Sequence, residues 1–448
     1  MSNTRTNTSR RGLRLLTLAI ACLTASTSPS RADAGDRSEA PAGDTKTTAA
    51  ATHVFVVGGM VHLGDGRIVP NATVEIEGTK VVAVHEAYTL ANVPSDAHTI
   101  DATGKIVTPG LIGADTSLGL LEIEMEASTR DHSRGDDSLV RAGYRPSTAI
   151  NADSSLLQIQ ALEGITSAAV APSGGLLSGQ VAWIDLLQGA HKDIVFAPSV
   201  AVDGRLGQTA AGSRAATIST LRRILQDARV LRGRASAYER RQLRDLAADA
   251  ADLEALFPVL DGKIPLTLTA NRTSDLLAAL ELAKEFDLRL VLLGGAEAWR
   301  VRAELARAGV TVIVQPSSNL PRDFDSLGSR LENAALLHEA GVKVGIAVLG
   351  DPHNVRNARQ EAGIAASYGL PREAAISAVT HVIAAAYGMD QSHGSLEAGK
   401  IANLVVWSGD PLELSSWPEA VIIRGAQIPP VSRQSQLRDR YLRRLRTK

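Results

Sequence analysis

The strongest constraint on the fold is a regular alternation of short apolar runs with helical stretches through the middle of the chain. The helical stretches include residues 273–286 and 296–309, and strand–helix–strand spacing predicts a parallel sheet covered on both faces. The candidate strands are KIVTPGLIGA, ITSAAVAP, DIVFAPSVAV, IPLTLTA, LRLVLLGG, VTVIVQPS and VKVGIAVLG. A closed (β/α)8 TIM-like barrel needs eight strands. We therefore expect an α/β barrel over residues 105–392 with one irregular strand and a charged helical excursion at 213–257.

The two ends of this region have a different pattern. Residues 53–104 contain the short Val-rich segments VFVVGGMVHL, ATVEIEG and KVVAVHE, and residues 393–428 contain ANLVVWSGDP and AVIIRGAQI. A sheet of this kind needs further strands to cover its apolar face. We expect one small β-sandwich module built from both ends around the barrel.

The first 34 residues read as a secretory signal peptide. Arginines precede the apolar run LLTLAIACLTAST, and the small-x-small site ADA ends at Ala34. Such a segment is too short and wrongly flanked for a membrane span. The expectation is a periplasmic or secreted protein, exported by the general or the twin-arginine route. Cleavage before Cys22, giving a lipoprotein, is the alternative.

Outside these regions, residues 35–52 are small and polar, which predicts a flexible linker, and residues 429–448 form a basic tail that we expect to be solvated. The formal net charge of −1 gives no reason to expect a nucleic-acid partner. Cys22 is the only cysteine of the 448 residues. Disulfides, thiolate zinc sites and a cysteine nucleophile are therefore not expected in the mature chain.

Four phrases resemble the amidohydrolase superfamily, and within it the imidazolonepropionase-like secreted members. They are DATGKIVTPGLIGA (101–114), APSGGLLSGQ (171–180), GDPHNVRNARQEAGIA (350–365) and GSLEAGKIANLVVWSGDPLE (394–413). The resemblance implies metal-assisted hydrolysis at the carboxyl ends of the barrel strands, with zinc or another divalent metal as cofactor. It also implies a small-molecule substrate in the barrel mouth.

The metal-ligand positions that the resemblance implies are largely replaced. Asp115 and Ser117 stand where the family has His-x-His after its first strand, and Thr269, Gly294 and Gly295 stand at later histidine positions. Lys263 precedes its strand, so a carboxylated bridging lysine is not expected. The family's last acid falls on Asp351 or, in the other alignment, on Gly350. No cofactor is therefore predicted from the residues themselves, and the metal site is predicted to be degenerate.

Asp115, Asp351 and His353 are the predicted catalytic residues. His353 follows a strand end and can act as a general base, or it can be a helix-start histidine that bonds a neighbouring loop. Asp115 can be a base or a polar plug in a vacated metal cavity. Several other features have structural interpretations that compete with functional ones: the possible anion cradle SGGLLSGQ, the mouth-loop residues Asp131 and His132, the helix residue His381, and the module histidines His62, His85 and His98.

Two functions follow, and the sequence does not decide whether the protein is an enzyme. The first is hydrolysis of a carbon–nitrogen bond other than a peptide bond, in a cyclic amide or dipeptide-like substrate. The second is a non-catalytic scaffold or ligand-binding subunit, as a homo-oligomer or in a hetero-oligomer with an intact relative.

Overall fold

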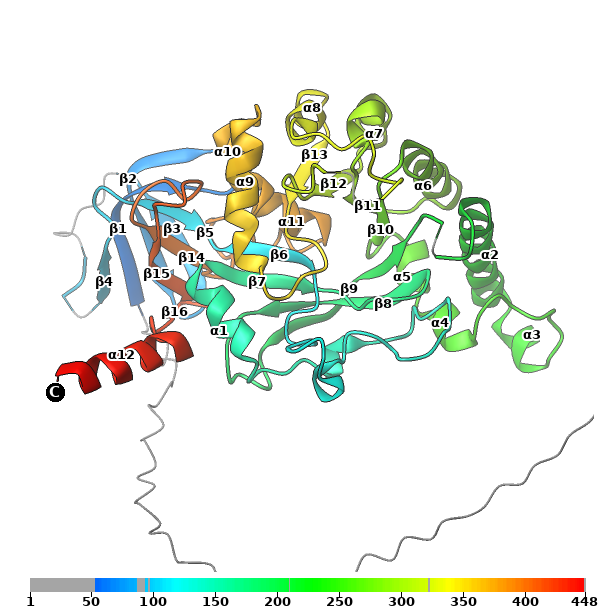
Figure 1. Ribbon diagram of the computed structural model, residues 1–448, viewed down its shortest axis with the longest axis horizontal. Helices are drawn as coiled ribbons and strands as arrows, with labels where there is room; N and C mark the ends of the chain where they lie inside the picture. The colour runs from blue at the N-terminus through cyan, green and yellow to red at the C-terminus, as the bar shows by residue number, and fades with distance from the viewer. Residues whose placement is uncertain (1–52, 87–92, 96, 209, 321–322, 447–448) are drawn as a thin grey trace, which may run out of the picture. The chain divides into compact units, whose positions relative to one another are not determined.

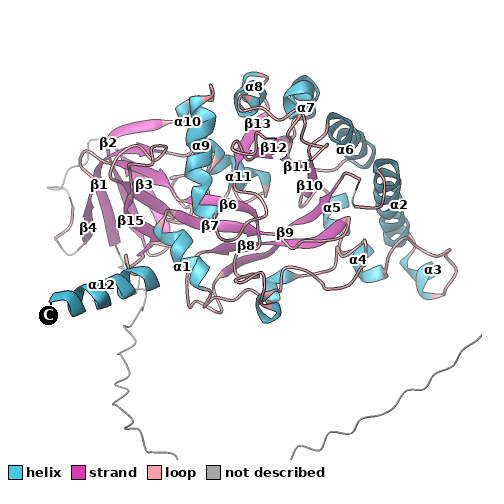
Figure 2. Ribbon diagram, viewed as in Figure 1, coloured by secondary structure: helices cyan, strands magenta, loops and turns pink. Residues whose placement is uncertain are grey.

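The structure is a computed structural model, and it describes residues 53–86, 93–95, 97–208, 210–320 and 323–446. These residues form two eight-stranded sheets with helices arranged around one of them (Figures 1 and 2). The predicted signal peptide and the linker lie outside the described residues.

The larger α/β part is built on a curled sheet with the order β13-β12-β11-β10-β9-β8-β7-β6. All pairs are parallel except those that β8 makes with β7 and β9. The strands are β6 (Leu111–Thr116), β7 (Ile165–Val170), β8 (Leu177–Asp185), β9 (Val195–Arg205), β10 (Leu266–Ala270), β11 (Leu290–Gly294), β12 (Thr311–Val314) and β13 (Lys343–Ile346). This mixed α/β architecture confirms the predicted fold class, as an incompletely closed barrel.

Strand β8 is the irregular eighth strand, and it corrects one expectation. Leu177–Gln180 belongs to the phrase that was predicted to form a tight loop and a possible anion cradle, yet every residue of β8 is buried. Only the turn at Gly174 and Gly175 precedes the strand, and the guanidinium of Arg141 packs against Gly174. The segment runs antiparallel because a short turn joins β7 to β8, with no room for a crossover helix.

Helices cover the outer face of this sheet, and one helix fills its inner face. The outer helices include α2 (Arg214–Gly233), which buries Leu221 and Ile224 in the main core instead of forming an excursion outside the barrel. The helix α11 (His381–Ala386) packs inside, against β8, β11 and β12 residues such as Trp183. The other helices are α1 (Ser155–Leu162), α3 (Ala235–Glu239), α4 (Ala250–Glu254), α5 (Phe257–Leu260), α6 (Thr273–Phe286), α7 (Arg302–Ala308), α8 (Asn333–Glu339), α9 (Ala358–Ser367), α10 (Arg372–Ala378) and α12 (Arg433–Arg446).

The second sheet combines strands from both chain ends, as expected for the β module. Its order is β16-β15-β14-β5-β1-β2-β3, and β4 also pairs with β1. The strands are β1 (His53–His62), β2 (Ile68–Glu77), β3 (Lys80–His85), β4 (His98–Asp101), β5 (Ile106–Pro109), β14 (Leu404–Trp407), β15 (Pro418–Ile423) and β16 (Ala426–Gln427). Strand β5 belongs to this sheet, whereas β6 begins the barrel immediately after Gly110.

A buried polar cluster joins the module to the barrel at the amino-terminal end of the parallel strands. Asp185, at the end of β8, has no exposed surface. Its Oδ1 accepts hydrogen bonds from Ser167 Oγ (2.7 Å) and Asn403 Nδ2 (3.0 Å) and lies 3.1 Å from His393 Nε2. Its Oδ2 accepts from Arg424 Nε at 2.5 Å. Burial alone raises the pKa of Asp185, but His393, Arg424 and Ser167 together lower it below the usual value.

Candidate active site

Asp115 lies where β6 ends, in an unusual backbone conformation. Its φ is +49°, in the left-handed region that few residues other than Gly, Asn and Asp adopt. The pairing of β6 with β7 shifts register between Gly113 and Thr116. The carbonyl oxygen of Asp115 accepts a hydrogen bond from Gly350 N at 2.7 Å. A bulge at a strand end re-aims a side chain, so the local structure gives residue 115 an orientation that regular strand alternation would not.

A second carboxylate, Asp203, lies near the carboxyl end of β9. Only 5% of this residue is exposed, and its Oδ1 accepts a hydrogen bond from Thr267 Oγ1 at 2.7 Å. Burial raises the pKa of Asp203 to about 6, although Thr267 and the charge of Arg205 oppose the shift. The carboxyl group therefore exchanges its proton close to neutral pH.

At this end of the sheet the charge of Asp203 acts on Asp115, and the charges of both aspartates act on Tyr387. Burial raises the pKa of Asp115 well above its usual value, and the charge of Asp203 raises it further. Burial raises the pKa of Tyr387 as well, and both aspartates add to that shift. Arg205, which is exposed at the end of β9, lowers the pKa of both carboxyl groups. Two acids that disfavour simultaneous ionisation can share one proton.

Asp351 and His353 follow β13 and are held in a local turn. Asp351 Oδ1 accepts from the backbone N–H of His353 at 2.7 Å, and Oδ2 accepts from Asn354 Nδ2 at 2.7 Å. This aspartate therefore caps its own turn. Gly350 brings the turn beside Asp115 through the backbone bond, but the structure shows no side-chain bond between Asp115 and Asp351 within the described residues.

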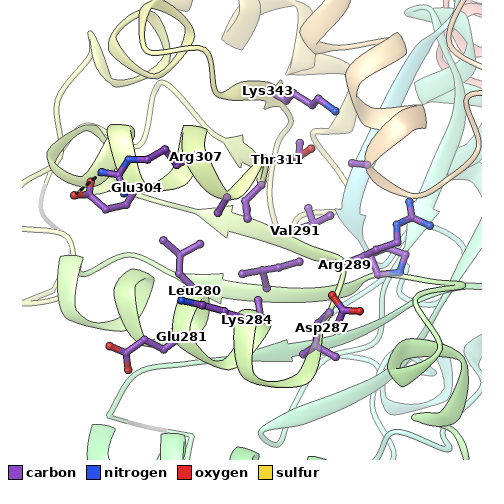
Figure 3. A pocket seen from close by; sticks show the side chains of 18 of the residues that line it. Leu280, Glu281, Lys284, Asp287, Arg289, Val291, Glu304, Arg307, Thr311 and Lys343 are labelled. Atoms are coloured by element: carbon purple, nitrogen blue, oxygen red, sulfur yellow. Dashed lines mark ion pairs between the residues drawn. The ribbon is translucent and has the colours of Figure 1, made fainter.

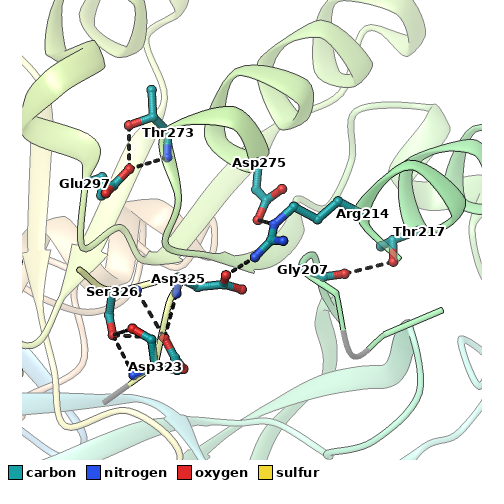
Figure 4. A network of polar contacts seen from close by, with 9 residues as sticks. All are labelled: Gly207, Arg214, Thr217, Thr273, Asp275, Glu297, Asp323, Asp325 and Ser326. Carbon is teal, nitrogen blue, oxygen red and sulfur yellow. Dashed lines mark hydrogen bonds and ion pairs between the residues drawn. The ribbon is translucent and has the colours of Figure 1, made fainter. Parts of the chain in front are cut away.

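Figure 4 shows the polar network that ties the loops together at the carboxyl end of the sheet. Arg214, at the start of α2, pairs with Asp275 of α6 at 3.3 Å and with Asp325 in the loop after β12. Glu297, after β11, accepts hydrogen bonds from the N–H and hydroxyl of Thr273 at 2.9 and 2.7 Å. These contacts order the loops that follow β9, β10, β11 and β12, where barrel enzymes place their chemistry.

A pocket of about 910 Å³ opens at the opposite end, where β11, β12 and β13 begin (Figure 3). Its lining includes Arg289, Thr311 and Lys343, together with Lys284 of α6 and Arg307 of α7. The aspartate pair is not part of this lining. The pocket and the two aspartates therefore lie at different ends of the sheet, and the aspartates lie at the end where barrel enzymes place their chemistry.

Comparison with known families identifies the carboxyl-terminal part of the barrel and the module strands that follow it. The model of the amidohydrolase family matches residues 269–428. The chain is also 24% identical to the amidohydrolase tasK of Hapsidospora irregularis over 78% of its own length, although it spans only 39% of that relative.

Solved structures show the same fold over most of the chain. An amidohydrolase from Thermotoga maritima MSB8 has a TM-score of 0.74 at 24% identity and covers 84% of this chain and 99% of its own. An adenosine deaminase from Xanthomonas campestris with bound zinc has a TM-score of 0.51 at 16% identity, covering 88% and 99%. The amidohydrolase resemblance is confirmed, whereas the imidazolonepropionase-like subtype stays a prediction.

Three of the positions predicted to correspond to amidohydrolase metal ligands, Ser117, Gly294 and Gly295, lie in closely packed surroundings. A Cβ added to Gly294, whose φ is +86°, would lie 2.5 Å from Asn271 Oδ1. Gly295 donates its N–H to the carbonyl of Ala270, and Ser117 is 7% exposed. The region beyond β11 is therefore filled by Asn271, and a side chain at position 294 would have to displace it.

The described residues do not fit a zinc site of the amidohydrolase type. No group of three or more His, Cys, Asp or Glu side chains that could hold a metal occurs in the part of the chain that the structure describes. Zinc needs three or four donors of this kind. Amidohydrolases commonly bind zinc or another divalent metal, and the donor set of the described residues does not match that requirement.

The other residues singled out in the sequence lie before a strand, at the start of a helix, in the β module or in a loop. Lys263 precedes β10, is exposed and pairs with Asp261 at 3.3 Å. His381 begins α11, whereas His62, His85 and His98 lie in the β module. His132 lies in the loop beside Ser173, whose N–H donates to its carbonyl, and burial lowers its pKa. Asp131 of the same loop is exposed.

Sequence reasoning missed Asp203, Arg205 and Tyr387. The phrase SVAVDGR offered a usable signal, because two charged residues end an apolar run at the carboxyl end of a predicted strand. Tyr387 gave no such signal, since its position depends on α11 lying inside the sheet.

Proposed function

We propose that this protein hydrolyses a carbon–nitrogen bond other than a peptide bond, with Asp115 and Asp203 as its acid–base pair. The observation that carries the proposal is the presence of two aspartates with raised pKa values at the carboxyl ends of β6 and β9. Perturbed acids in this position are typical of catalytic groups, although structural networks also produce them. The amidohydrolase family supports the reaction class.

In the proposed reaction the pair holds one proton. The ionised carboxylate takes a proton from water while the water oxygen forms a bond to the carbonyl carbon. The other carboxyl group gives its proton to the nitrogen as the C–N bond breaks, so that an acid and an amine leave and the pair again holds one proton. Proton transfer by positioned carboxyl groups contributes about 10²–10⁴-fold to a rate.

Arg205 favours an anionic substrate. Its guanidinium is exposed at the end of β9 and acts electrostatically on both aspartates. An arginine in this place can bind a carboxylate through two parallel hydrogen bonds. We therefore propose a substrate that carries a carboxylate beside its amide, as a dipeptide-like compound or a carboxylated cyclic amide does.

Amine release from N-acyl amino acids, dipeptides and carboxylated cyclic amides tests the proposal. The protein is purified without a histidine tag, and its metal content is measured by mass spectrometry. We expect Asp203→Asn to lower turnover about 100-fold. Asp193→Asn changes an exposed acid in the turn between β8 and β9 and should leave turnover unchanged.

Three results would contradict this assignment. Full turnover in Asp203→Asn removes the pair from the chemistry, and a larger loss in Asp351→Asn moves the site to the turn after β13. Turnover that requires about one equivalent of bound zinc replaces the proposed mechanism with metal-assisted hydrolysis. If no compound is turned over but one binds stoichiometrically, the non-catalytic ligand-binding alternative takes the place of the hydrolase.

A further inference from the structure

The basic segment near the carboxyl terminus forms a helix with a defined start, where the sequence predicted only a solvated tail. Ser432 and Ser435 exchange hydrogen bonds, each backbone N–H donating to the other's Oγ, at 2.8 and 3.1 Å. This reciprocal arrangement resembles a capping box. Gln158 of α1 holds the preceding residues by donating to the carbonyls of Pro429 (3.3 Å) and Val431 (3.1 Å). The start of α12 is thus anchored to the barrel.

Beyond this anchor, α12 carries an apolar stripe in contact with solvent. Leu437, Tyr441 and Leu445 are spaced by four residues and lie on one face of the helix. Their exposed fractions rise along the helix from 37% to 58% to 70%, and Leu442 beside them is 43% exposed. No residue of α12 is buried. Figure 1 shows the far end of α12 pointing away from the labelled strands and helices.

The charge of α12 is strongly one-sided. The helix contains six arginines and one acid, Asp439, which pairs with Arg438 at 2.8 Å. The guanidinium of Arg444 lies over the ring of Tyr441, 5.9 Å from its centre, so charge and apolar surface lie next to each other. Long arginine side chains can keep their charge at a polar surface while their stems cover apolar area.

We propose that α12 binds the surface of an anionic lipid bilayer, with Leu437, Tyr441 and Leu445 entering the boundary between headgroups and acyl chains. A short helix with an apolar stripe and arginines on its polar face has the composition of an interfacial helix, and clustered arginines match anionic headgroups. None of the helices among the described residues is long and apolar enough to span a membrane. At 14 residues, α12 is about 21 Å long and lies along the surface.

Co-sedimentation of the full chain with lipid vesicles tests this proposal. We expect partitioning onto vesicles that contain phosphatidylglycerol to be at least about tenfold stronger than onto phosphatidylcholine alone, and to weaken as salt is added. The double variant Tyr441→Ser/Leu445→Ser should lose binding because the apolar stripe is removed. Arg440→Glu/Arg446→Glu should lose it because the charge is reversed.

A matched control removes similar exposed apolar surface elsewhere. Phe324 and Leu327 are 83% and 60% exposed in the loop after β12, and Phe324→Ser/Leu327→Ser should bind vesicles as the unmodified protein does. Equal melting temperatures verify that every variant is folded. The proposal is overturned if the unmodified protein does not prefer anionic vesicles, or if the α12 variants still bind. It is also overturned if those variants convert a dimer to a monomer, which would mean that a second copy covers the stripe.

Discussion

Asp185 and Asp203 lie on neighbouring strands and are both almost completely buried, yet the net shifts of their pKa values have opposite signs. Asp185 ends β8 at the junction with the β module, and its pKa is lowered. Asp203 lies near the end of β9, at the opposite end of the sheet, and its pKa is raised to about 6. Both carboxyl groups leave water on folding. The difference is in the charge of the donors. Arg424 and His393 contact the carboxylate of Asp185 directly, whereas the hydrogen bonds to Asp203 come from uncharged groups such as Thr267.

This comparison distinguishes a structural acid from the acid that we propose as catalytic. A buried carboxylate with enough donors is stable as an ion and holds two parts of a protein together. One that is hydrogen-bonded only by uncharged groups keeps its proton to higher pH and remains available for proton transfer. In barrel proteins the amino-terminal end of the strands serves stability and the carboxyl-terminal end serves chemistry, and the proposed roles of the two aspartates follow that division.

The largest expected effect is the loss of the Asp185 charge. Asp185→Asn leaves Arg424 without its carboxylate in a largely buried setting, and breaking such a pair costs about 3–5 kcal/mol. Urea unfolding followed by circular dichroism measures the free energy of unfolding. Asp193→Asn, an exposed substitution on the adjoining turn, serves as the control and should stay within about 0.5 kcal/mol. A loss below about 1 kcal/mol would mean that the junction does not depend on this ion.

The second prediction concerns Asp203 and the pH dependence of stability. Here the ionised carboxylate should lower the free energy of unfolding, whereas that of Asp185 raises it. Because the pKa of Asp203 is about 6 in the folded protein and the ordinary value is 3.8, the folded state binds the proton more tightly. This group therefore lowers the free energy of unfolding as the pH rises from about 4 to 7, by at most about 3 kcal/mol. Asp203→Asn should flatten that part of the profile, and its folded state should be at least as stable as the unmodified one at pH 7.

Urea titrations at several pH values measure this profile. Asp193→Asn should keep the slope of the unmodified protein, and Asp115→Asn should reduce it, because the pKa of Asp115 is raised by the same surroundings. An unchanged slope in Asp203→Asn would show that Asp203 is as well solvated or paired as Asp185, and the contrast between the two acids would fail.

Much of the fold was predictable because apolar runs of strand length are separated by helical stretches. Each of the seven parallel strands of the barrel sheet overlaps such a run, although β6 and β9 extend two and three residues beyond theirs. Strand β8 was not predicted, because glycine and serine occur at and just before its start and these residue types are also common in loops. The division between β5 and β6 was hidden for another reason. One apolar phrase runs through Gly110, and only the three-dimensional pairing assigns its halves to different sheets.

The candidate site was less predictable than the fold. Asp115 was identified because the amidohydrolase phrase is broken at that position. Its pKa is raised by burial and then by the charge of Asp203, which is 88 residues further along the chain, and neither effect could be read from the sequence. Asp351 was predicted as a catalytic residue, and the Asx turn that its carboxylate makes in DPHN was not predicted. The network around Asp185 was not readable, because its members come from four separate segments and meet only when the module docks on the barrel.

The third prediction compares the packing at the two ends of the barrel sheet. It uses one glycine from each end, Gly110 before β6 and Gly350 after β13. A Cβ at Gly110, between β5 and β6, would collide with the side chain of Thr166, whereas Gly350 has open space and only a positive φ of +72°. Gly110→Ala should cost about 3 kcal/mol, at the upper end for overpacking, and Gly350→Ala about 1 kcal/mol from left-handed backbone strain. Thermal unfolding of both variants measures the difference. Equal losses would mean that the two ends are packed alike.

The smallest effect is expected for Lys263. Substituting it tests whether a carboxylated lysine near β10 takes part in turnover. The side chain is exposed at the amino-terminal end of that strand and its only ion pair is a surface contact with Asp261 among the described residues. Lys263→Ala should therefore change the free energy of unfolding by less than about 1 kcal/mol and leave turnover unaltered. A carboxylated bridging lysine would give the opposite result, with turnover lost and then restored by a high bicarbonate concentration. Such a rescue would place a catalytic group at the amino-terminal end of the sheet. The proposed division between a structural end with Asp185 and a catalytic end with Asp203 would then be wrong.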